Sequence, residues 1–401
     1  MMNKRTIGNS SIGVFKRQMG IYIHIPFCAK KCSYCDFLSA PADDDTIKAY
    51  IEAMLLEIKA SRSEVVVPVP TIFFGGGTPS IIDPTYIERI MEAIREQYEV
   101  ESEAEITIEC NPGTVSLKKL LAYKDAGINR ISFGLQSTDN IELKSIGRIH
   151  TYEQFQNSYE MARRAGFDNI NIDLIAALPN QTMASWENTL RKVIDLQPEH
   201  ISAYSLILEE GTPLYTVIEM ERTNGIDRIP CEDNEREMYY LTNEMLKKAG
   251  YIHYEISNYS KPGYECRHNL SYWAPDHYIS FGIGAASYVN DIRYKNVEDI
   301  KEYIEYLTEA KIIDLSEIQV EVNQLTKENK MEEFMFLGLR RIDGISIKEF
   351  FKRFGVRYDS IYGTLTKKFV EQELLIHTDD RIYLSPRGID VSNSVMCEFL
   401  L

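Results

Sequence analysis

The chain has 401 residues, of which 44% are hydrophobic and 26% charged, and its formal net charge is −16. This length favours a large α/β domain with a smaller one appended, and the negative charge argues against nucleic acid as a partner, because that contact needs a local excess of lysine and arginine. No run of 18 apolar residues suggests a transmembrane helix. Seven cysteines, an odd number, and no secretory segment favour a reducing, cytoplasmic location.

Residues 1–18 contain four basic residues and no acidic one, a composition that is also found in transit peptides. Met19-Gly20 directly precedes the first predicted strand, however. We therefore expect residues 1–18 to be a disordered tail or an over-long start.

An alternating apolar run at residues 21–25 predicts a short strand, closed by Pro26. Cys28, Cys32 and Cys35 follow it as C-x3-C-x2-C. Thiolates this close together suit a metal centre better than disulfides. Three ligands leave one iron of an iron–sulfur cube open for another ligand, which suits chemistry or ligand exchange. A zinc site or unrelated thiols are the alternatives.

Strands then alternate with helices, a pattern typical of parallel βαβ units. Six such units by residue 206 fit a barrel or partial barrel better than a doubly wound sheet. The predicted helices span residues 43–60, 84–97, 116–126, 152–165 and 183–196, and the predicted strands span 71–74, 105–109, 130–133, 169–174 and 200–206.

Polar motifs stand where these strands end, which is the edge that carries chemistry in such barrels. The glycine run in residues 75–80 allows close backbone approach and exposes N–H and C=O groups to a ligand, although any tight turn can use glycine. Glu109 is placed to accept a hydrogen bond from an amine or ribose, or is a solvated rim residue. Alternation puts Asn171 and Asp173 on one face, where they need a ligand or each other.

Beyond the barrel, the pattern predicts a loop or broken helix at 213–225, a helix at 233–249 and a strand at 251–257. In the following 264–273 block, His268 and Asn269 stand beside Tyr272 and Trp273, a mixture that suits a planar ligand with an axial nitrogen, such as haem. A structural, hydrogen-bonded histidine is the alternative. Two weaker candidate ligands lie nearby, namely Cys266 and His277.

The segment 326–401 reads as three short helices and a hairpin, which suggests a small winged-helix-like module. It contains 12 Lys/Arg and 12 Asp/Glu. Without a basic excess, a lid or partner-docking role is favoured over DNA binding.

The cysteine loop and the strand-end motifs resemble the radical S-adenosylmethionine (SAM) proteins, and within them the coproporphyrinogen-oxidase-like branch. The resemblance implies a partial (β/α)6 TIM-type barrel at 19–210, a C-terminal α+β extension with the haem motif at 211–325, and the winged-helix-like module at 326–401. It also implies a [4Fe–4S] cluster on the three cysteines, with SAM bound through its amino and carboxylate groups at the open iron.

The resemblance further implies a set of SAM contacts, including contacts to a second SAM molecule. The matching positions are Tyr22, Tyr34, Gly76, Gly77, Thr78, Glu109, Gln136, Arg148 and Asp173. One departure is that Ala176-Ala177 stands where the family usually has a glycine before Leu178-Pro179, so the local backbone is expected to differ.

Two functions follow from the resemblance. H-N-x-x-Y-W at 268–273 matches a signature of haem chaperones in this branch, with His268 as the haem ligand and an acceptor protein, such as a membrane-bound respiratory enzyme, as the partner. The alternative is an oxygen-independent coproporphyrinogen III dehydrogenase. Those enzymes carry a fourth cysteine after C-x3-C-x2-C and a longer arm before the first strand, whereas Asp36-Phe37 follows Cys35 here. The chaperone is therefore favoured, and a homodimer is left open.

Overall fold

The computed structural model describes residues 18–61 and 67–401. The tail expected at residues 1–18 thus lies outside the described residues, except for Gln18. At the centre of the fold, six parallel strands follow one another across the sheet in chain order. They are β1 (Met19–Ile25), β2 (Pro68–Gly76), β3 (Glu99–Cys110), β4 (Arg130–Gln136), β5 (Ile170–Ala176) and β6 (His200–Ser205).

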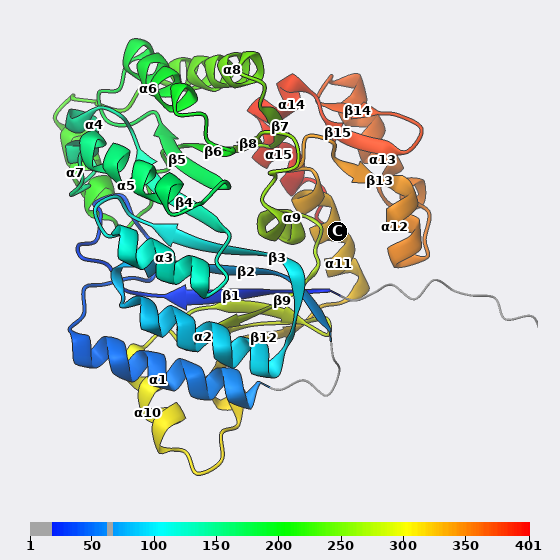
Figure 1. Cartoon of the computed structure of the whole chain (residues 1–401). Helices are drawn as coiled ribbons and strands as arrows, with labels where there is room; N and C mark the ends of the chain where they lie inside the picture. The colour runs from blue at the N-terminus through cyan, green and yellow to red at the C-terminus, as the bar shows by residue number, and fades with distance from the viewer. Residues whose placement is uncertain (1–17, 62–66) are drawn as a thin grey trace, which may run out of the picture.

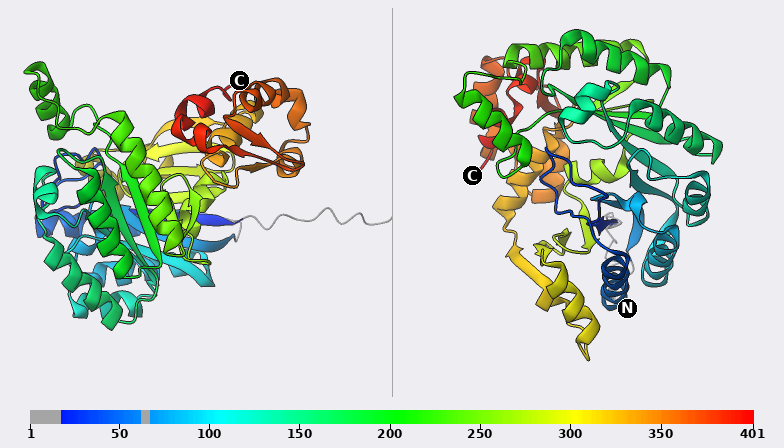
Figure 2. Two further views of the ribbon diagram at one scale, coloured as in Figure 1. Left: turned by 90° about the horizontal axis from the view of Figure 1, so that it is seen from above. Right: turned by 90° about the vertical axis from the view of Figure 1, so that its left-hand side faces the viewer.

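Helices connect these strands and cover the outer face of the curved sheet (Figure 2), which confirms the α/β partial barrel. Each of the five long helices begins after a polar side chain that accepts a hydrogen bond from a first-turn N–H. They are α1 (Asp44–Ala60), α2 (Pro84–Gln97), α3 (Leu117–Asp125), α5 (Tyr152–Arg164) and α6 (Met183–Asp195), with the short η1 (Pro79–Ile81) and α4 (Asn140–Ser145) between them.

The sheet continues past both edges of the barrel to a total of 12 strands among the described residues. β9 (His277–Phe281) pairs parallel with β1, and β10 (Ala286–Val289), β11 (Ile292–Asn296) and β12 (Gln319–Gln324) extend it antiparallel. At the other edge, β8 (Asn258–Ser260) pairs with β6, and β7 (Ile252–Glu255) pairs with β8. The region after the barrel therefore completes the same sheet. The sequence patterns had not indicated β9–β12.

One prediction for the region after the barrel is wrong, and a second is confirmed only in part, as β7 within 251–257. The expected loop or broken helix at 213–225 is the continuous helix α7 (Pro213–Thr223), followed by α8 (Glu232–Lys248). Pro213 occupies the first turn, where it is compatible with a helix, and Gly225 lies just beyond the end. The single strand expected at 251–257 is the β7–β8 hairpin, because the Glu255 carboxylate accepts hydrogen bonds from the Ser257 N–H and the Asn258 amide and so folds the turn.

A C-terminal unit with its own hydrophobic core is coloured orange to red in Figure 1. It lies beside the short helix α9 (Arg267–Trp273). Its core is built around Phe334, Phe350, Tyr358 and Phe399. The unit consists of α11 (Lys327–Gly338), β13 (Ile345–Ser346), α12 (Ile347–Phe354), α13 (Tyr358–Glu371), β14 (Leu375–His377), β15 (Arg381–Leu384), α14 (Pro386–Asp390) and α15 (Ser392–Cys397). The remaining elements are α10 (Ile300–Glu309) and η2 (Leu315–Ile318). Among the described helices, none is long and apolar enough to cross a membrane.

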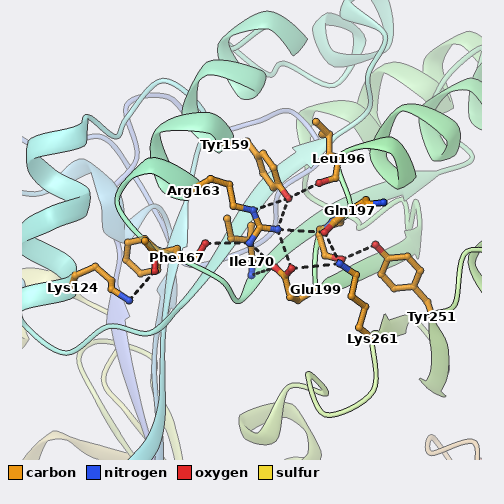
Figure 3. Close-up of polar contacts among 12 residues, drawn as sticks. Lys124, Tyr159, Arg163, Phe167, Ile170, Leu196, Gln197, Glu199, Tyr251 and Lys261 are labelled. Atoms are coloured by element: carbon orange, nitrogen blue, oxygen red, sulfur yellow. Dashed lines mark hydrogen bonds and ion pairs between the residues drawn. The ribbon is translucent and has the colours of Figure 1, made fainter.

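The amino ends of β5 and β6 are tied together by the carboxylate of Glu199 (Figure 3). It accepts the Ile170 N–H at 3.1 Å, pairs with Arg163 at 2.8 Å and with Lys261 at 3.5 Å. Glu199 is only 8% exposed. The Glu199 carboxylate thus has three partners at the end of the barrel opposite the cysteine loop. Through Lys261 it also connects the barrel to the segment after β8.

Candidate functional site

The three cysteines of the predicted metal loop lie in one pocket at the carboxyl ends of the parallel strands. All three are free thiols of intermediate exposure. Backbone hydrogen bonds hold the loop at its start, from Cys28 N–H to the Ala40 carbonyl, and in its middle, from Ser33 N–H to the Ile146 carbonyl, both at 3.1 Å. The fold thus supplies a fixed loop with three sulfur ligands facing a common space.

Three free cysteines in one pocket are the donor type that holds an iron–sulfur cluster. Within residues 18–61 and 67–401, no three His, Cys, Asp or Glu side chains converge tightly enough to hold one metal ion. A cube does not need such convergence, because each thiolate binds a different iron. The pocket also contains two buried atoms without a hydrogen-bond partner, Oε1 of Gln136 and Nε of Arg148. Unpaired polar atoms of this kind call for a ligand.

A chain of hydrogen bonds connects two of the cysteines through the pocket wall. The Thr78 hydroxyl lies 3.4 Å from the Cys28 sulfur and accepts the Asn111 amide at 2.7 Å. Asn111 in turn accepts from Arg148 at 2.8 Å, and Arg148 donates to the Cys32 sulfur at 3.6 Å. Donors to sulfur stabilise thiolates. The sequence reasoning missed Asn111, although its place two residues after Glu109 at a strand end was the available signal.

The glycine run at the end of β2 packs closely on the cysteine loop, and Gly76, Gly77 and Thr78 line the same pocket as the cysteines. A side chain at Gly77 would lie 2.8 Å from the Phe27 carbonyl oxygen, and Gly76 has φ of +109°. The N–H groups of Gly77 and Thr78 donate to the carbonyls of Ile25 and Phe27 at 2.9 and 2.8 Å. The expectation that these N–H groups face a ligand is therefore wrong, because they fasten this loop to the cysteine loop instead.

Two carboxylates face the pocket from the strands on either side of β4, Glu109 on β3 and Asp173 on β5. Burial raises the pKa of Glu109 to about 8, and the charge of Asp173 adds to the shift. Burial also raises the pKa of Asp173, opposed by its hydrogen bonds from Asn171 at 2.8 Å and Ser132 at 2.9 Å. The prediction that Asn171 and Asp173 share a face and need each other is confirmed.

Of the other predicted SAM contacts, Gln136 and Tyr34 line the cysteine pocket and Tyr22 does not. Gln136 ends β4 with φ of +73°, a strained conformation for a residue with a side chain, at an irregularity in the pairing of β4 with β5. Tyr34 lines the pocket and packs against the small apolar cluster that includes Leu178. Tyr22 is not among the pocket residues; it lines a different cavity, and its pKa is raised by burial and then by the nearby Glu109 and Tyr272. Tyr22 therefore stands between the two cavities.

That second cavity, which we call the aromatic cavity, has a volume of about 390 Å³. Its aromatic lining is formed by Tyr22, Tyr272, Trp273, Tyr278 and Tyr288. The residues come from β1, α9, β9 and β10, so the motif on α9 and the sheet extension build it together.

His268, the predicted haem ligand, lies directly behind this aromatic wall. Its side chain is 1% exposed, and its ring stacks on Phe73 at 5.2 Å between ring centres. Nδ1 is hydrogen-bonded to the Thr71 hydroxyl and Nε2 to the Tyr272 hydroxyl, both at 2.9 Å. Burial, with the charge of Arg130, lowers the pKa of His268 to about 3, so the imidazole is neutral. In this conformation Tyr272 separates the imidazole from the cavity.

The position of His268 is set by a residue that the sequence reasoning missed. Glu105 on β3 is buried and accepts the N–H groups of Arg267 and His268 at 3.1 and 3.0 Å, which caps the start of α9. Cys266, a weaker candidate for the haem ligand, is fully buried; burial raises the pKa of its thiol to about 12, and its sulfur lies 3.6 Å from Glu105. His277 lies on β9, against the ring of Tyr288.

Comparison with known proteins places these features in a family. The profile of the Radical SAM superfamily matches residues 22–193, and that of the HemN C-terminal domain matches residues 325–391. A "Heme chaperone HemW" of Lactococcus lactis is 39% identical over 380 residues, covering 95% of this chain and 97% of the relative. The chain belongs to the HemW family. A second member, from Bacillus subtilis, is 35% identical over 94% of this chain and 98% of its own length.

Family membership confirms the resemblance to radical SAM proteins and implies SAM and a [4Fe–4S] cluster as cofactors. Coproporphyrinogen III oxidase (HemN) from Escherichia coli, described as a radical SAM enzyme, superposes with a TM-score of 0.81 at 22% identity, over 96% of this chain and 90% of that one. At this identity the likeness establishes the shared fold. The superposition extends from the barrel to the C-terminal unit of this chain.

Proposed function

We propose that this protein is a haem chaperone that binds haem and a SAM-ligated [4Fe–4S] cluster and transfers haem to an acceptor protein. The observation that carries the proposal is the aromatic cavity, because Tyr272 and Trp273 of the motif both line it and the Tyr272 hydroxyl is hydrogen-bonded to His268. The near full-length similarity to two proteins named as haem chaperones supports it.

In this proposal Cys28, Cys32 and Cys35 hold the cluster. A bound cluster supplies an open iron for the amino and carboxylate groups of SAM. Thr78 and Arg148 contact two of the sulfurs, those of Cys28 and Cys32. The unpaired oxygen of Gln136 and the carboxylates of Glu109 and Asp173 are the acceptors that the pocket offers to SAM.

At the haem site the chain supplies a neutral imidazole, which is the form that binds iron. Thr71 holds Nδ1, which orients the ring and leaves Nε2 as the ligating atom. Ligation at Nε2 requires the Tyr272 hydroxyl to move away, at a cost of about 1 kcal/mol for one exchanged hydrogen bond. This cost is small against the free energy of a tight ligand, about 8 kcal/mol at micromolar Kd.

The test is a haem titration of the anaerobically purified chain, followed by the Soret band. His268→Ala is expected to weaken binding at least tenfold and leave iron and sulfide content unchanged. His377→Ala, on the exposed strand β14, serves as the matched control and should change neither. Replacing the three cysteines should remove the cluster and leave haem binding. Haem binding that is indifferent to His268 contradicts its role as ligand.

The acceptor is tested by incubating the haem-loaded protein with haem-depleted respiratory membranes and measuring transferred haem. The same preparation, supplied with SAM, reductant and coproporphyrinogen III, should form no protoporphyrinogen. Conversion of that substrate would establish the dehydrogenase in place of the chaperone. The cytoplasmic location and a homodimer remain predictions, the latter measured by sedimentation.

A further inference from the structure

The segments that follow β2 and β3, residues 77–83 and 111–116, are held by one shared cation, the ammonium of Lys119. Lys119 lies in the first turn of α3, and its Nζ is within 3.4 Å of four backbone carbonyl oxygens. They are those of Ser80 at 2.9 Å, Ile82 at 3.2 Å, Ile81 at 3.3 Å and Thr114 at 3.4 Å. We call the two segments the β2 loop and the β3 loop. Lys119 thus connects both loops through their backbones.

The two loops also contact each other directly. The hydroxyl oxygens of Ser80 and Thr114 lie 2.6 Å apart, and the Ser80 hydroxyl oxygen accepts the Asn111 N–H at 3.2 Å. The Thr114 hydroxyl donates to the Asn111 carbonyl at 2.7 Å. These hydrogen bonds, together with those of Lys119, hold the backbone of Asn111 against the β2 loop.

The spacing of the two loops matters because each carries a side chain of the cysteine pocket. Thr78 lines the pocket from the β2 loop and Asn111 from the β3 loop, and their side chains meet at 2.7 Å. From there Thr78 reaches the Cys28 sulfur at 3.4 Å, and Asn111 accepts from Arg148 at 2.8 Å. A hydrogen bond is lost at about 3.6 Å, so a shift of about 1 Å between the loops would break this link.

Lys119 itself lies outside the pocket. It is half-buried, and it is not among the residues that line the pocket with the cysteines. Any effect of Lys119 on the pocket therefore passes through the two loops. An ammonium suits this position, because hydrogen bonds from a charged donor are roughly twice as strong as those between neutral groups.

We propose that Lys119 is a positioning residue for the SAM site, which sets the spacing of Thr78 and Asn111 by holding the backbones of both loops. The inference rests on the proposed function, in which the three cysteines hold a cluster that SAM ligates. It adds to that function a residue outside the pocket on which the affinity for SAM depends.

The experiment compares Lys119→Met with Lys124→Met in the full chain. Methionine keeps an unbranched apolar side chain and removes the ammonium. Lys124 lies on the same helix and donates to the Gly166 carbonyl at 3.1 Å, in the turn after α5 (Figure 3). The control therefore loses the same kind of contact, away from the β2 and β3 loops. Lys119→Arg retains charged donors and tests for rescue.

The first measurement is hydrogen–deuterium exchange of the cluster-free protein. In the β2 loop the Ile81 N–H donates to the Thr78 carbonyl, and in the β3 loop the Thr114 N–H donates to the Asn111 carbonyl. Lys119→Met should exchange faster than the unaltered protein in both loops. Lys124→Met should exchange faster only around Gly166.

The second measurement is the change in the cluster's electron paramagnetic resonance signal as SAM is titrated into the anaerobically reconstituted protein. Lys119→Met should need roughly threefold to tenfold more SAM for the same change. This is less than the loss of about 10–100-fold that is typical for direct partners of metal ligands, because Lys119 acts through the loops. Lys124→Met and Lys119→Arg should respond like the unaltered protein.

An equal SAM requirement in Lys119→Met and Lys124→Met overturns the inference, since Lys119 would then stabilise the fold alone. If Lys119→Met does not fold, Lys119→Gln, which keeps an amide donor on a shorter side chain, is titrated against Lys124→Gln, and the same comparison decides. An unaltered protein that takes up a cluster but does not respond to SAM overturns the proposed SAM-ligated cluster itself. The two failures are thus distinguishable in one set of titrations.

Discussion

Asn111→Ala tests whether the hydrogen-bond chain between Cys28 and Cys32 organises the pocket. The substitution removes the acceptor for Arg148 and the donor to Thr78. A hydrogen bond to a charged group contributes about 1.5–3 kcal/mol and a neutral one about 1 kcal/mol. Water entering from the pocket replaces part of this, so we expect a loss of about 2 kcal/mol in the free energy of unfolding.

Urea unfolding of the cluster-free protein measures that loss. Two further measurements report on the site, namely the iron content and the change in the cluster's electron paramagnetic resonance signal when SAM is added. We expect the reconstituted variant to retain less iron and to need more SAM for the change. Asn140→Ala is the matched control, since Asn140 also makes two side-chain hydrogen bonds, but at an exposed helix start. A variant at position 111 within about 0.5 kcal/mol of the unaltered protein, with full iron and SAM response, refutes the reasoning.

Four further predictions concern single positions. Ala177 has φ of +58°, so Ala177→Gly should raise the free energy of unfolding by about 0.5–1 kcal/mol in urea titration. Tyr272→Phe removes the hydroxyl that competes for the imidazole, so it should tighten haem binding by up to about tenfold in a Soret titration. The pKa of Glu109 is raised to about 8 in the folded protein, so between pH 5 and 8 the folded state holds a proton that the unfolded state lacks. The free energy of unfolding should therefore fall as the pH rises from 5 to 8, and Glu109→Gln should make that fall smaller. Glu199→Gln should cost about 2–3 kcal/mol and Glu187→Gln, in an exposed pair, under about 1 kcal/mol, both by thermal or urea unfolding.

The barrel could be predicted because its elements carry strong local signals. Several strands contain buried apolar residues in series, as β1 and β5 do, and each long helix of the barrel starts at a side chain that caps it, as Asp83 does for α2 and Thr151 for α5. The extension was not predicted, since β11 and β12 are short and consist largely of polar and charged residues. Their pairing depends on neighbours distant in the chain, which a local pattern does not contain.

The residues of the site also differ in how well the sequence predicts them. The cysteines are recognisable from spacing alone, because ligand spacing within one loop is a local property. The burial of His268 is not, since it results from Phe73 on β2, Glu105 on β3 and the fold of α9 over both. Ala177 is the instructive case. The absence of the family's usual glycine before Leu178 predicted an altered backbone. In the structure Ala177 has a left-handed conformation, with φ of +58°.

Strand β1 is hydrogen-bonded on both sides, to β2 and to β9, so it cannot slide. It carries Tyr22 at the aromatic cavity and leads within six residues to Cys28. Six residues span at most about 20 Å. The distance between the cysteine pocket and the aromatic cavity is therefore limited by this one strand, which keeps the two sites at a fixed spacing in the fold.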